Sequence, residues 1–150
     1  MLETIFTTDA SAITLILRLV LGLVIIPHGL QKLFGWVGGY GFKGTMGFLT
    51  QTVKLPWIIG LLVILAESFG ALGVILGLGT RIGALGILAV MLGATLTVHR
   101  PIGFFMNWSG QQKGEGYEYH LLAMAMAVVL ILLGGGAWSI DGWLAAHLAS

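Results

Sequence analysis

The sequence contains no cysteine and few charged residues, and each of these absences excludes classes of protein. Without cysteine, the chain has no disulfide, no thiol chemistry and no thiolate ligand for zinc or an iron–sulfur cluster. Charged residues make up 9% of the 150 residues and hydrophobic residues 57%, whereas a soluble domain has roughly 25% charged residues. The composition therefore predicts a membrane protein whose main partner is the lipid bilayer.

The signals of common enzyme and nucleic-acid-binding classes are also missing. The net charge is +1, and Lys and Arg form no long run, so the chain has no basic surface for nucleic acid. No Gly-rich phosphate loop, dinucleotide fingerprint or Ser/His/Asp set is recognisable. We expect no intrinsic cofactor, so any redox role would need one from elsewhere.

Four long apolar segments predict an all-α integral membrane four-helix bundle that forms a single domain over residues 1–150. The expected helices cover residues 11–34, 57–78, 81–99 and 119–138. About 20 helical residues cross a bilayer core of roughly 30 Å. The first segment is expected to be retained rather than cleaved as a signal peptide, because Glu3 and Asp9 precede it in place of Lys or Arg.

The first long connection predicts a further short helix. Phe42, Met46, Leu49 and Val53 recur at helical spacing within it. This pattern favours a helix that lies in the membrane interface over an ordinary loop.

Positive charges flank the expected helices unevenly. The long connections and the adjacent helix ends carry Lys32, Lys43, Lys54, Arg100 and Lys113, whereas the side with both termini carries Arg81 alone. Cytoplasmic loops are enriched in Lys and Arg. The sequence therefore predicts a multi-pass protein of the inner or plasma membrane, with the long loops in the cytoplasm and both termini outside.

Glycines mark the faces on which the helices touch. Gly70, Gly73 and Gly77 follow one side of the second segment, and Gly86 and Gly93 repeat along the third. Small residues let membrane helices approach closely. These faces predict packing within one chain, or between copies in a homo-oligomer.

Arg18 and Glu67 are the two charges deep in the expected spans. A charge at the centre of a membrane helix costs about 2.5–3.5 kcal/mol on insertion scales, so each needs a partner, and antiparallel neighbouring helices would allow a bidentate ion pair. Two compatible interpretations stay open. The pair is a clamp that fixes which helix faces meet, or Arg18 poises Glu67 to exchange protons or to bond a polar head group. Glu67 is thus the candidate for a catalytic residue.

Further polar residues gather where the spans meet the long loops. They end the first and third expected helices and begin the fourth. The candidate ligand-binding or buried polar residues are Arg18, His28, Lys32, Glu67, His99, Glu118 and His120. Histidines on facing helices can hold haem, but no inward pair with ligand spacing occurs, so no metal site is expected.

Several short segments stand out along nearly the whole chain. They are residues 18–22 (RLVLG), 28–35 (HGLQKLFG), Glu67 with Gly70, residues 77–81 (GLGTR), Glu118, and the glycines 134–136 followed by WSID at 138–141. The deep Arg followed by His-Gly-x-x-Lys is the most specific of these. Together they resemble the DoxX family of small four-helix membrane proteins, which is named after an archaeal subunit associated with thiosulfate oxidation and quinone reduction. The resemblance implies a link to quinone-coupled redox chemistry.

These observations favour an accessory or quinone-interacting subunit of a membrane redox system, in which the chain is not catalytic alone. A quinone has an apolar tail for lipid and two oxygens for donors such as His or Lys, so His28 and Lys32 would lie at the pocket mouth. Two alternatives stay open. One is a small-molecule transporter or channel, for which intramembrane charges are expected. The other is a non-catalytic scaffold or assembly protein whose glycine faces bind other membrane subunits.

Overall fold

The computed structural model describes residue 8 and residues 11–148, and this part of the chain folds into helices joined by turns and loops, without a strand. Three of its helices are long and apolar enough to cross a membrane: Ala12–Phe34, Trp57–Leu76 and Thr80–His99. The predicted all-α membrane fold is confirmed.

The first long helix, α2 (Ala12–Phe34), has a clear start and stop. The Ser11 hydroxyl accepts a hydrogen bond from the backbone N–H of Ile13 at 3.1 Å, which satisfies one of the free donors at the helix N-terminus. Gly35 ends the helix in the left-handed conformation, with φ 77°. The local sequence therefore sets both ends of α2.

The second and third long helices each contain a π-helical turn. The second runs through α4 (Trp57–Leu65), η2 (Ala66–Gly70) and α5 (Ala71–Leu76), and the third through α6 (Thr80–Ala94) and η3 (Thr95–His99). The first connection holds α3 (Gly41–Gly47) followed by a third such turn, η1 (Phe48–Thr52). The predicted short helix in this connection is therefore present. Single π-helical turns within α-helices often occur at functional sites.

The fourth helix, α7 (Glu118–Leu133), ends before residue 138, where the sequence pattern placed its end. Gly134 takes φ 82° and ψ −162°, a conformation open mainly to glycine, so the chain leaves the helix five residues early. At about 24 Å for its 16 residues, α7 is shorter than the bilayer core.

Arg81 of α6 donates to the backbone carbonyls of Ile131 and Leu132 in the last turn of α7. A final helix, α8 (Ile140–Leu148), follows.

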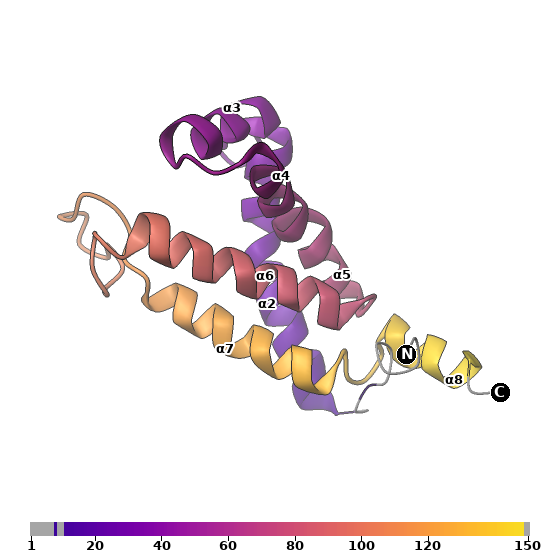
Figure 1. Cartoon of the computed structure of the whole chain (residues 1–150). Helices are drawn as coiled ribbons and strands as arrows, with labels where there is room; N and C mark the ends of the chain where they lie inside the picture. The colour runs from indigo at the N-terminus through magenta and orange to yellow at the C-terminus, as the bar shows by residue number, and fades with distance from the viewer. Residues whose placement is uncertain (1–7, 9–10, 149–150) are drawn as a thin grey trace.

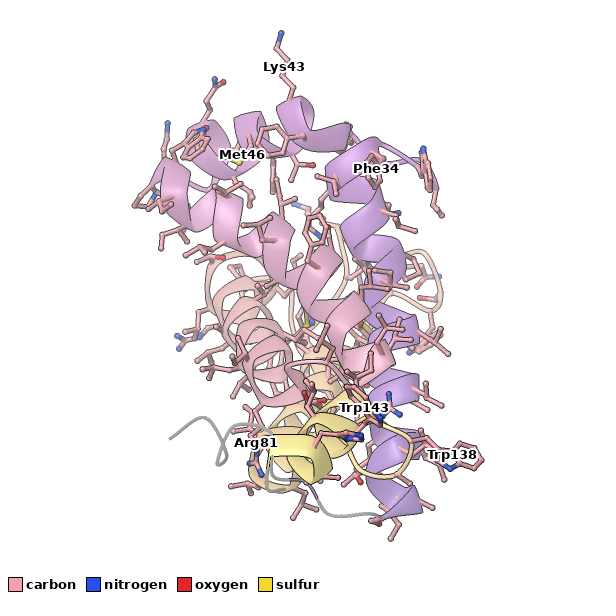
Figure 2. All side chains as sticks on the ribbon, turned by 90° about the vertical axis from the view of Figure 1, so that its right-hand side faces the viewer. Phe34, Lys43, Met46, Arg81, Trp138 and Trp143 are labelled. Carbon is pink, nitrogen blue, oxygen red and sulfur yellow. The ribbon has the colours of Figure 1, made fainter. Side chains whose placement is uncertain are left out.

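The bundle has two chemically different ends. We call the end with residues 35–56 and 100–117 the loop end, and the end with residues 77–79 and 134–148 the terminal end (Figures 1 and 2). In Figure 1, α4–η2–α5 and α6–η3 meet at the terminal end and separate toward the loop end. Helices α3 and η1 lie at the loop end and contact α4.

Glycine contacts explain where the helices approach most closely. A Cβ atom on Gly83 would lie 2.7 Å from the carbonyl oxygen of Gly70, so α6 and η2 are held together near the terminal end. A Cβ atom on Gly29 would lie 2.3 Å from the carbonyl oxygen of Glu67, which brings α2 against η2. Nothing lies within 4 Å of such an atom on Gly93, farther along α6. Small residues therefore join the helices at these points, and α6 diverges beyond them.

The predicted ion pair between Arg18 and Glu67 is wrong. The Arg18 guanidinium donates from Nη1 to the carbonyl oxygen of Ile75, and from Nη2 to those of Ala137 at 3.1 Å and Trp138 at 2.8 Å. The end of α5 leaves carbonyl groups without helical partners, and a buried guanidinium with five donors satisfies several carbonyls at once. Arg18 therefore joins α2, α5 and the segment before α8 at the terminal end.

A buried carboxylate fixes α8 to the same end. The carboxylate of Asp141 accepts the backbone N–H groups of Gly79 at 2.7 Å and Thr80 at 2.8 Å. These are free donors at the start of α6, where a negative charge is favourable. The terminal end is thus a network of hydrogen bonds around a helix turn, which indicates a structural role.

Candidate functional site

A large cavity lies between the two long helices that diverge toward the loop end. Its volume is about 910 Å³, within the 300–1,000 Å³ typical of ligand pockets. The walls are formed by α4–η2–α5 on one side and α6–η3 on the other, and η1 contributes Phe48 and Leu49. Most lining side chains are apolar.

The cavity opens sideways, at the depth of the apolar helices. Leu62, Phe69 and Ile82 line it and yet are 52%, 60% and 63% exposed. In a membrane this exposed surface faces lipid, so a ligand with an apolar part can enter from the bilayer.

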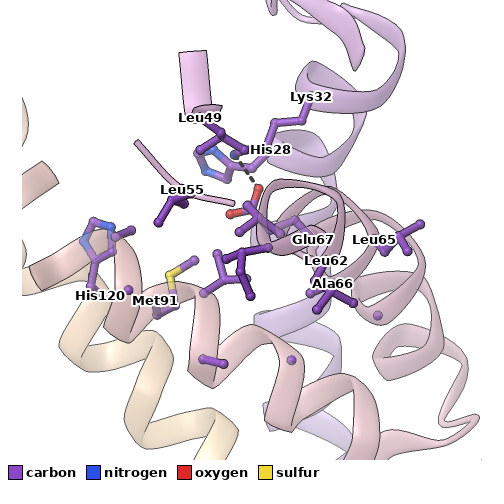
Figure 3. A pocket seen from close by; sticks show the side chains of 18 of the residues that line it. His28, Lys32, Leu49, Leu55, Leu62, Leu65, Ala66, Glu67, Met91 and His120 are labelled. Atoms are coloured by element: carbon purple, nitrogen blue, oxygen red, sulfur yellow. Dashed lines mark ion pairs between the residues drawn. The ribbon is translucent and has the colours of Figure 1, made fainter. Parts of the chain in front are cut away.

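Polar side chains occupy only the loop end of the cavity. Five of the residues predicted from the sequence line it: His28, Lys32, Glu67, His99 and His120. They come from α2, η2, η3 and α7. Figure 3 shows His28, Lys32 and Glu67 on one side of the cavity and His120 across from them. Segments far apart in the sequence thus supply one polar cluster.

Glu67 forms an ion pair with Lys32, which is drawn as a dashed line in Figure 3. The carboxylate side chain is 5% exposed and the ammonium side chain 25%. A buried charge needs an opposite charge to offset its lost hydration, and Gly29 brings the backbone of α2 close enough to η2 for this contact. The partner of Glu67 is therefore the lysine at the loop end of α2.

Two histidines pack against each other in the same polar cluster. The rings of His99 and His120 have centroids 4.2 Å apart. His120 is 6% exposed and its Nδ1 atom has no hydrogen-bond partner, whereas the Nδ1 atom of His99 is 2.8 Å from the carbonyl oxygen of Glu115. His28 lies against Tyr119, with ring centroids 6.3 Å apart. Imidazole groups that keep free nitrogen atoms can donate, accept or transfer protons.

All three π-helical turns border the cavity. The turn η2 carries Glu67, η3 carries His99, and η1 carries Phe48 and Leu49 at the loop end. The wider π-turn changes the direction in which the following side chains leave the helix. The two turns in the long helices thus present Glu67 and His99 to the site.

Comparison with known proteins assigns this chain to a protein family. The family model for DoxX matches residues 13–100. The chain belongs to the DoxX family. A curated relative, "Putative oxidoreductase CatD" of Bacillus subtilis (strain 168), is 28% identical over 128 residues, which cover 85% of this chain and 84% of the relative. No solved structure matches the chain.

The DoxX match covers most of the candidate site. It includes His28, Lys32, Glu67 and His99, and it ends before His120 and the loop that carries Glu115. The polar end of the cavity is thus built mainly from the part of the chain that defines the family.

Two of the predicted site residues do not line the cavity of this DoxX protein. Arg18 lies in the network at the terminal end. Glu118 accepts the backbone N–H of Met106 at 2.9 Å and the indole N–H of Trp108 at 3.1 Å, so it holds the loop of residues 100–117 in place. Both side chains therefore have structural partners. Among the described residues, no group of three or more His, Asp or Glu could hold a metal ion.

Other features of the site were missed by sequence reasoning. The backbone carbonyl of Glu115 bonds His99, and a backbone contact across a loop leaves no sequence pattern. Phe48 and Leu49 line the cavity. The helical spacing of Leu49 with Phe42 and Met46 was a usable signal, because it showed an apolar face that needs something to pack against.

Proposed function

We propose that this DoxX protein is a membrane subunit of a redox system and that its cavity binds a membrane quinone. The observation that carries the proposal is the distribution of polarity in the cavity. Its polar residues lie at one end and the remainder is apolar and open to lipid. Such a site suits a molecule with one polar head group and one long apolar chain.

The length of the cavity supports an elongated ligand. Its lining extends along the third long helix from Ile82 to His99, which corresponds to about 25 Å at 1.5 Å per residue. A single ring would fill the polar end only, so an apolar tail is needed to use the whole cavity.

The residues at the loop end fit a quinone head group. A quinone oxygen accepts hydrogen bonds, and Lys32, His28 and His120 carry N–H donors. His120 is a buried side chain with an unpartnered nitrogen atom, and such an atom costs about 1–3 kcal/mol unless a partner is supplied. When bound, the quinone would supply the two-electron, two-proton redox chemistry. The chain itself would bind and orient the head group and keep the tail in an apolar channel.

The name of the relative, "Putative oxidoreductase CatD", supports the redox link. We propose that the electrons are exchanged with a separate redox subunit, so that this chain is an accessory subunit. We place it in the cell membrane, with the long loops in the cytoplasm, because Lys43, Lys54 and Arg100 lie at the loop end.

The test is to measure the binding of quinones with and without a tail. The protein is purified in mild detergent, its endogenous ligands are identified by mass spectrometry, and quinone binding is followed by quenching of tryptophan fluorescence. The Gly93→Phe variant should lose binding at least tenfold, because Gly93 lines the cavity and faces open space that the ring would fill. Gly47→Phe is the matched control, since it adds the same ring at a helical glycine with open space outside the cavity.

Equal affinity for tailed and tail-less quinones would contradict the proposal, and so would unchanged binding in Gly93→Phe. A purified wild-type protein that binds no quinone would also contradict it. Measurements of solute flux in liposomes and of copurifying proteins would then examine transport and scaffolding.

A further inference from the structure

The hydrogen bond between His99 and Glu115 determines which nitrogen of His99 carries a proton. A backbone carbonyl oxygen can only accept, so the Nδ1 atom of His99, 2.8 Å away, must be the donor. In the neutral imidazole the proton is then on Nδ1, and the Nε2 atom holds the free lone pair. A hydrogen-bond partner on one ring nitrogen fixes the tautomer and the orientation of a histidine that acts through its other nitrogen.

The free nitrogen of His99 belongs to a residue that lines the polar end of the cavity. Within the described part of the chain, the Nδ1 bond to Glu115 is the hydrogen bond that His99 makes. Its ring packs against that of His120, with centroids 4.2 Å apart. His99 thus offers an acceptor nitrogen whose tautomer is fixed by the backbone carbonyl of Glu115.

The surrounding charges leave this role to His99. Glu67 is the carboxylate that the long helices contribute to the cavity lining, and it is paired with Lys32. The titratable groups that line the cavity with His99, or pack against those that do, are His28 and Lys32 on α2, Glu67 on η2, Tyr119 and His120 on α7, and Glu115 in the adjoining loop.

We propose that His99 accepts a proton from a hydroxyl group on the head of the bound ligand, and that the site therefore takes the hydroxyl-bearing form, a quinol or another phenol with an apolar tail. This inference rests on the proposed function for the place of the ligand. In the step, the O–H bond of the ligand breaks, an N–H bond forms at Nε2, and the electron pair stays on the ligand oxygen. The imidazolium keeps its Nδ1–H bond to Glu115, and the proton leaves to water at the loop end.

The probe for this step is a nitrophenol that carries a long alkyl chain, because its phenol and phenolate forms differ in absorbance. The protein is reconstituted in phosphatidylcholine vesicles, and the pH at which half of the bound probe is phenolate is compared with that in vesicles alone. A proton acceptor next to the hydroxyl stabilises the phenolate. We therefore expect the wild-type protein to lower this midpoint by about one pH unit, which corresponds to a tenfold change in the ionisation constant.

The key variant is His99→Asn, whose amide can still donate to the carbonyl of Glu115 but provides no base. It should bind the probe and return the midpoint to the value in vesicles alone. The matched control is His147→Asn, because His147 has the same Nδ1 contact with a backbone carbonyl, that of Trp143 at 2.8 Å, away from the cavity. This control should behave as the wild type does.

A second measurement needs no variant. The O-methyl ether of the same probe has no hydroxyl proton, and the wild-type protein should bind it at least tenfold more weakly than the phenol. Three results would overturn the role of His99 while leaving the cavity as a ligand site. They are probe binding without a shift of the midpoint, a shift that persists in His99→Asn, and equal affinity for the phenol and the ether. Absence of any probe binding to the wild type would instead overturn the proposed function, and this inference with it.

Discussion

Arg18 and Lys32, two cations of α2, show how residue type decides between structure and function in this membrane protein. Arg18 donates to three backbone carbonyls at the terminal end, whereas Lys32 pairs with the carboxylate of Glu67 at the loop end. The planar guanidinium suits several fixed acceptors at once, and the ammonium is a compact point charge that can pair with one. Arg18 is therefore the structural cation, and Lys32 belongs to the site.

The Arg18→Lys variant should test this division. A lysine cannot reach the carbonyls of Ile75 and Trp138 together, so carbonyls at helix ends lose a charged donor. We expect a loss of about 2–3 kcal/mol in the free energy of unfolding in detergent, with the affinity for a tailed quinone unchanged in the folded fraction. A large loss of affinity without a loss of stability would contradict the structural role.

The Lys32–Glu67 ion pair should show strong coupling between its partners. Glu67→Gln leaves Lys32 without its counter-charge, and Lys32→Met leaves the carboxylate unpaired. Each single variant should lose about 3 kcal/mol, because breaking a buried pair costs about 3–5 kcal/mol and the Lys32 side chain is 25% exposed. The double variant should recover most of this loss in a double-mutant cycle of unfolding in detergent. Additive losses would contradict a direct pairing.

At the residue scale, the sequence identified which groups are unusual more reliably than it identified their partners. Arg18 and Glu67 stood out because a membrane span rarely contains charge. Their pairing was wrong because opposite charges were matched by depth alone. The free carbonyls at the end of α5 and the segment before α8 compete for the guanidinium, and neither is visible in a pattern of side chains.

At the scale of helices, two glycines of α6 should respond in opposite ways to the same change. Gly83→Ala places a Cβ atom 2.7 Å from the carbonyl oxygen of Gly70, so the helices must separate. Gly93→Ala meets nothing within 4 Å. We expect the first to lose about 1–3 kcal/mol through overpacking, and the second to gain up to about 1 kcal/mol through helix propensity. Thermal unfolding in detergent measures both.

Equal stability of the two alanine variants would show that the Gly70–Gly83 contact does not hold α6 against η2. The comparison is clean because both glycines lie in α6 and both substitutions add one methyl group.

The sequence predicted the elements well where local signals exist. Ser11 and Gly35 bound α2, and the apolar runs define the three long helices. The end of α7 was placed too late, at residue 138, whereas Gly134 already takes a positive φ. The π-helical turns η2 and η3 were not predicted, because helical spacing alone does not distinguish them from α-helix.

At the scale of the whole molecule, the orientation in the membrane can be measured directly. The chain has no cysteine, so single cysteines report without background. Ser109→Cys at the loop end should react with a membrane-impermeant thiol reagent only after the cells are opened, because loops rich in Lys and Arg stay in the cytoplasm. Ala146→Cys in α8 should react in intact cells. The reverse pattern would show the opposite orientation.

The cavity itself could not be predicted from the sequence. Helical periodicity shows which faces are apolar, but it does not give the angle at which two helices leave a turn. The divergence of α4–η2–α5 from α6–η3 depends on where glycines allow contact and where larger side chains prevent it. The polar residues of α2 accordingly belong to two separate groups at opposite ends, Arg18 to the terminal end and Lys32 to the loop end of the cavity.

The sideways opening between Leu62, Phe69 and Ile82 determines how occupancy should be counted. A ligand that arrives through this opening is drawn from a two-dimensional reservoir, where its abundance is set by its ratio to lipid. The concentration of the ligand in water then has little influence on the occupancy of the cavity. Titrations at several lipid concentrations should superimpose when plotted against the mole fraction of ligand in the membrane. A site with modest intrinsic affinity would accordingly be filled in any bilayer where the ligand is a common component.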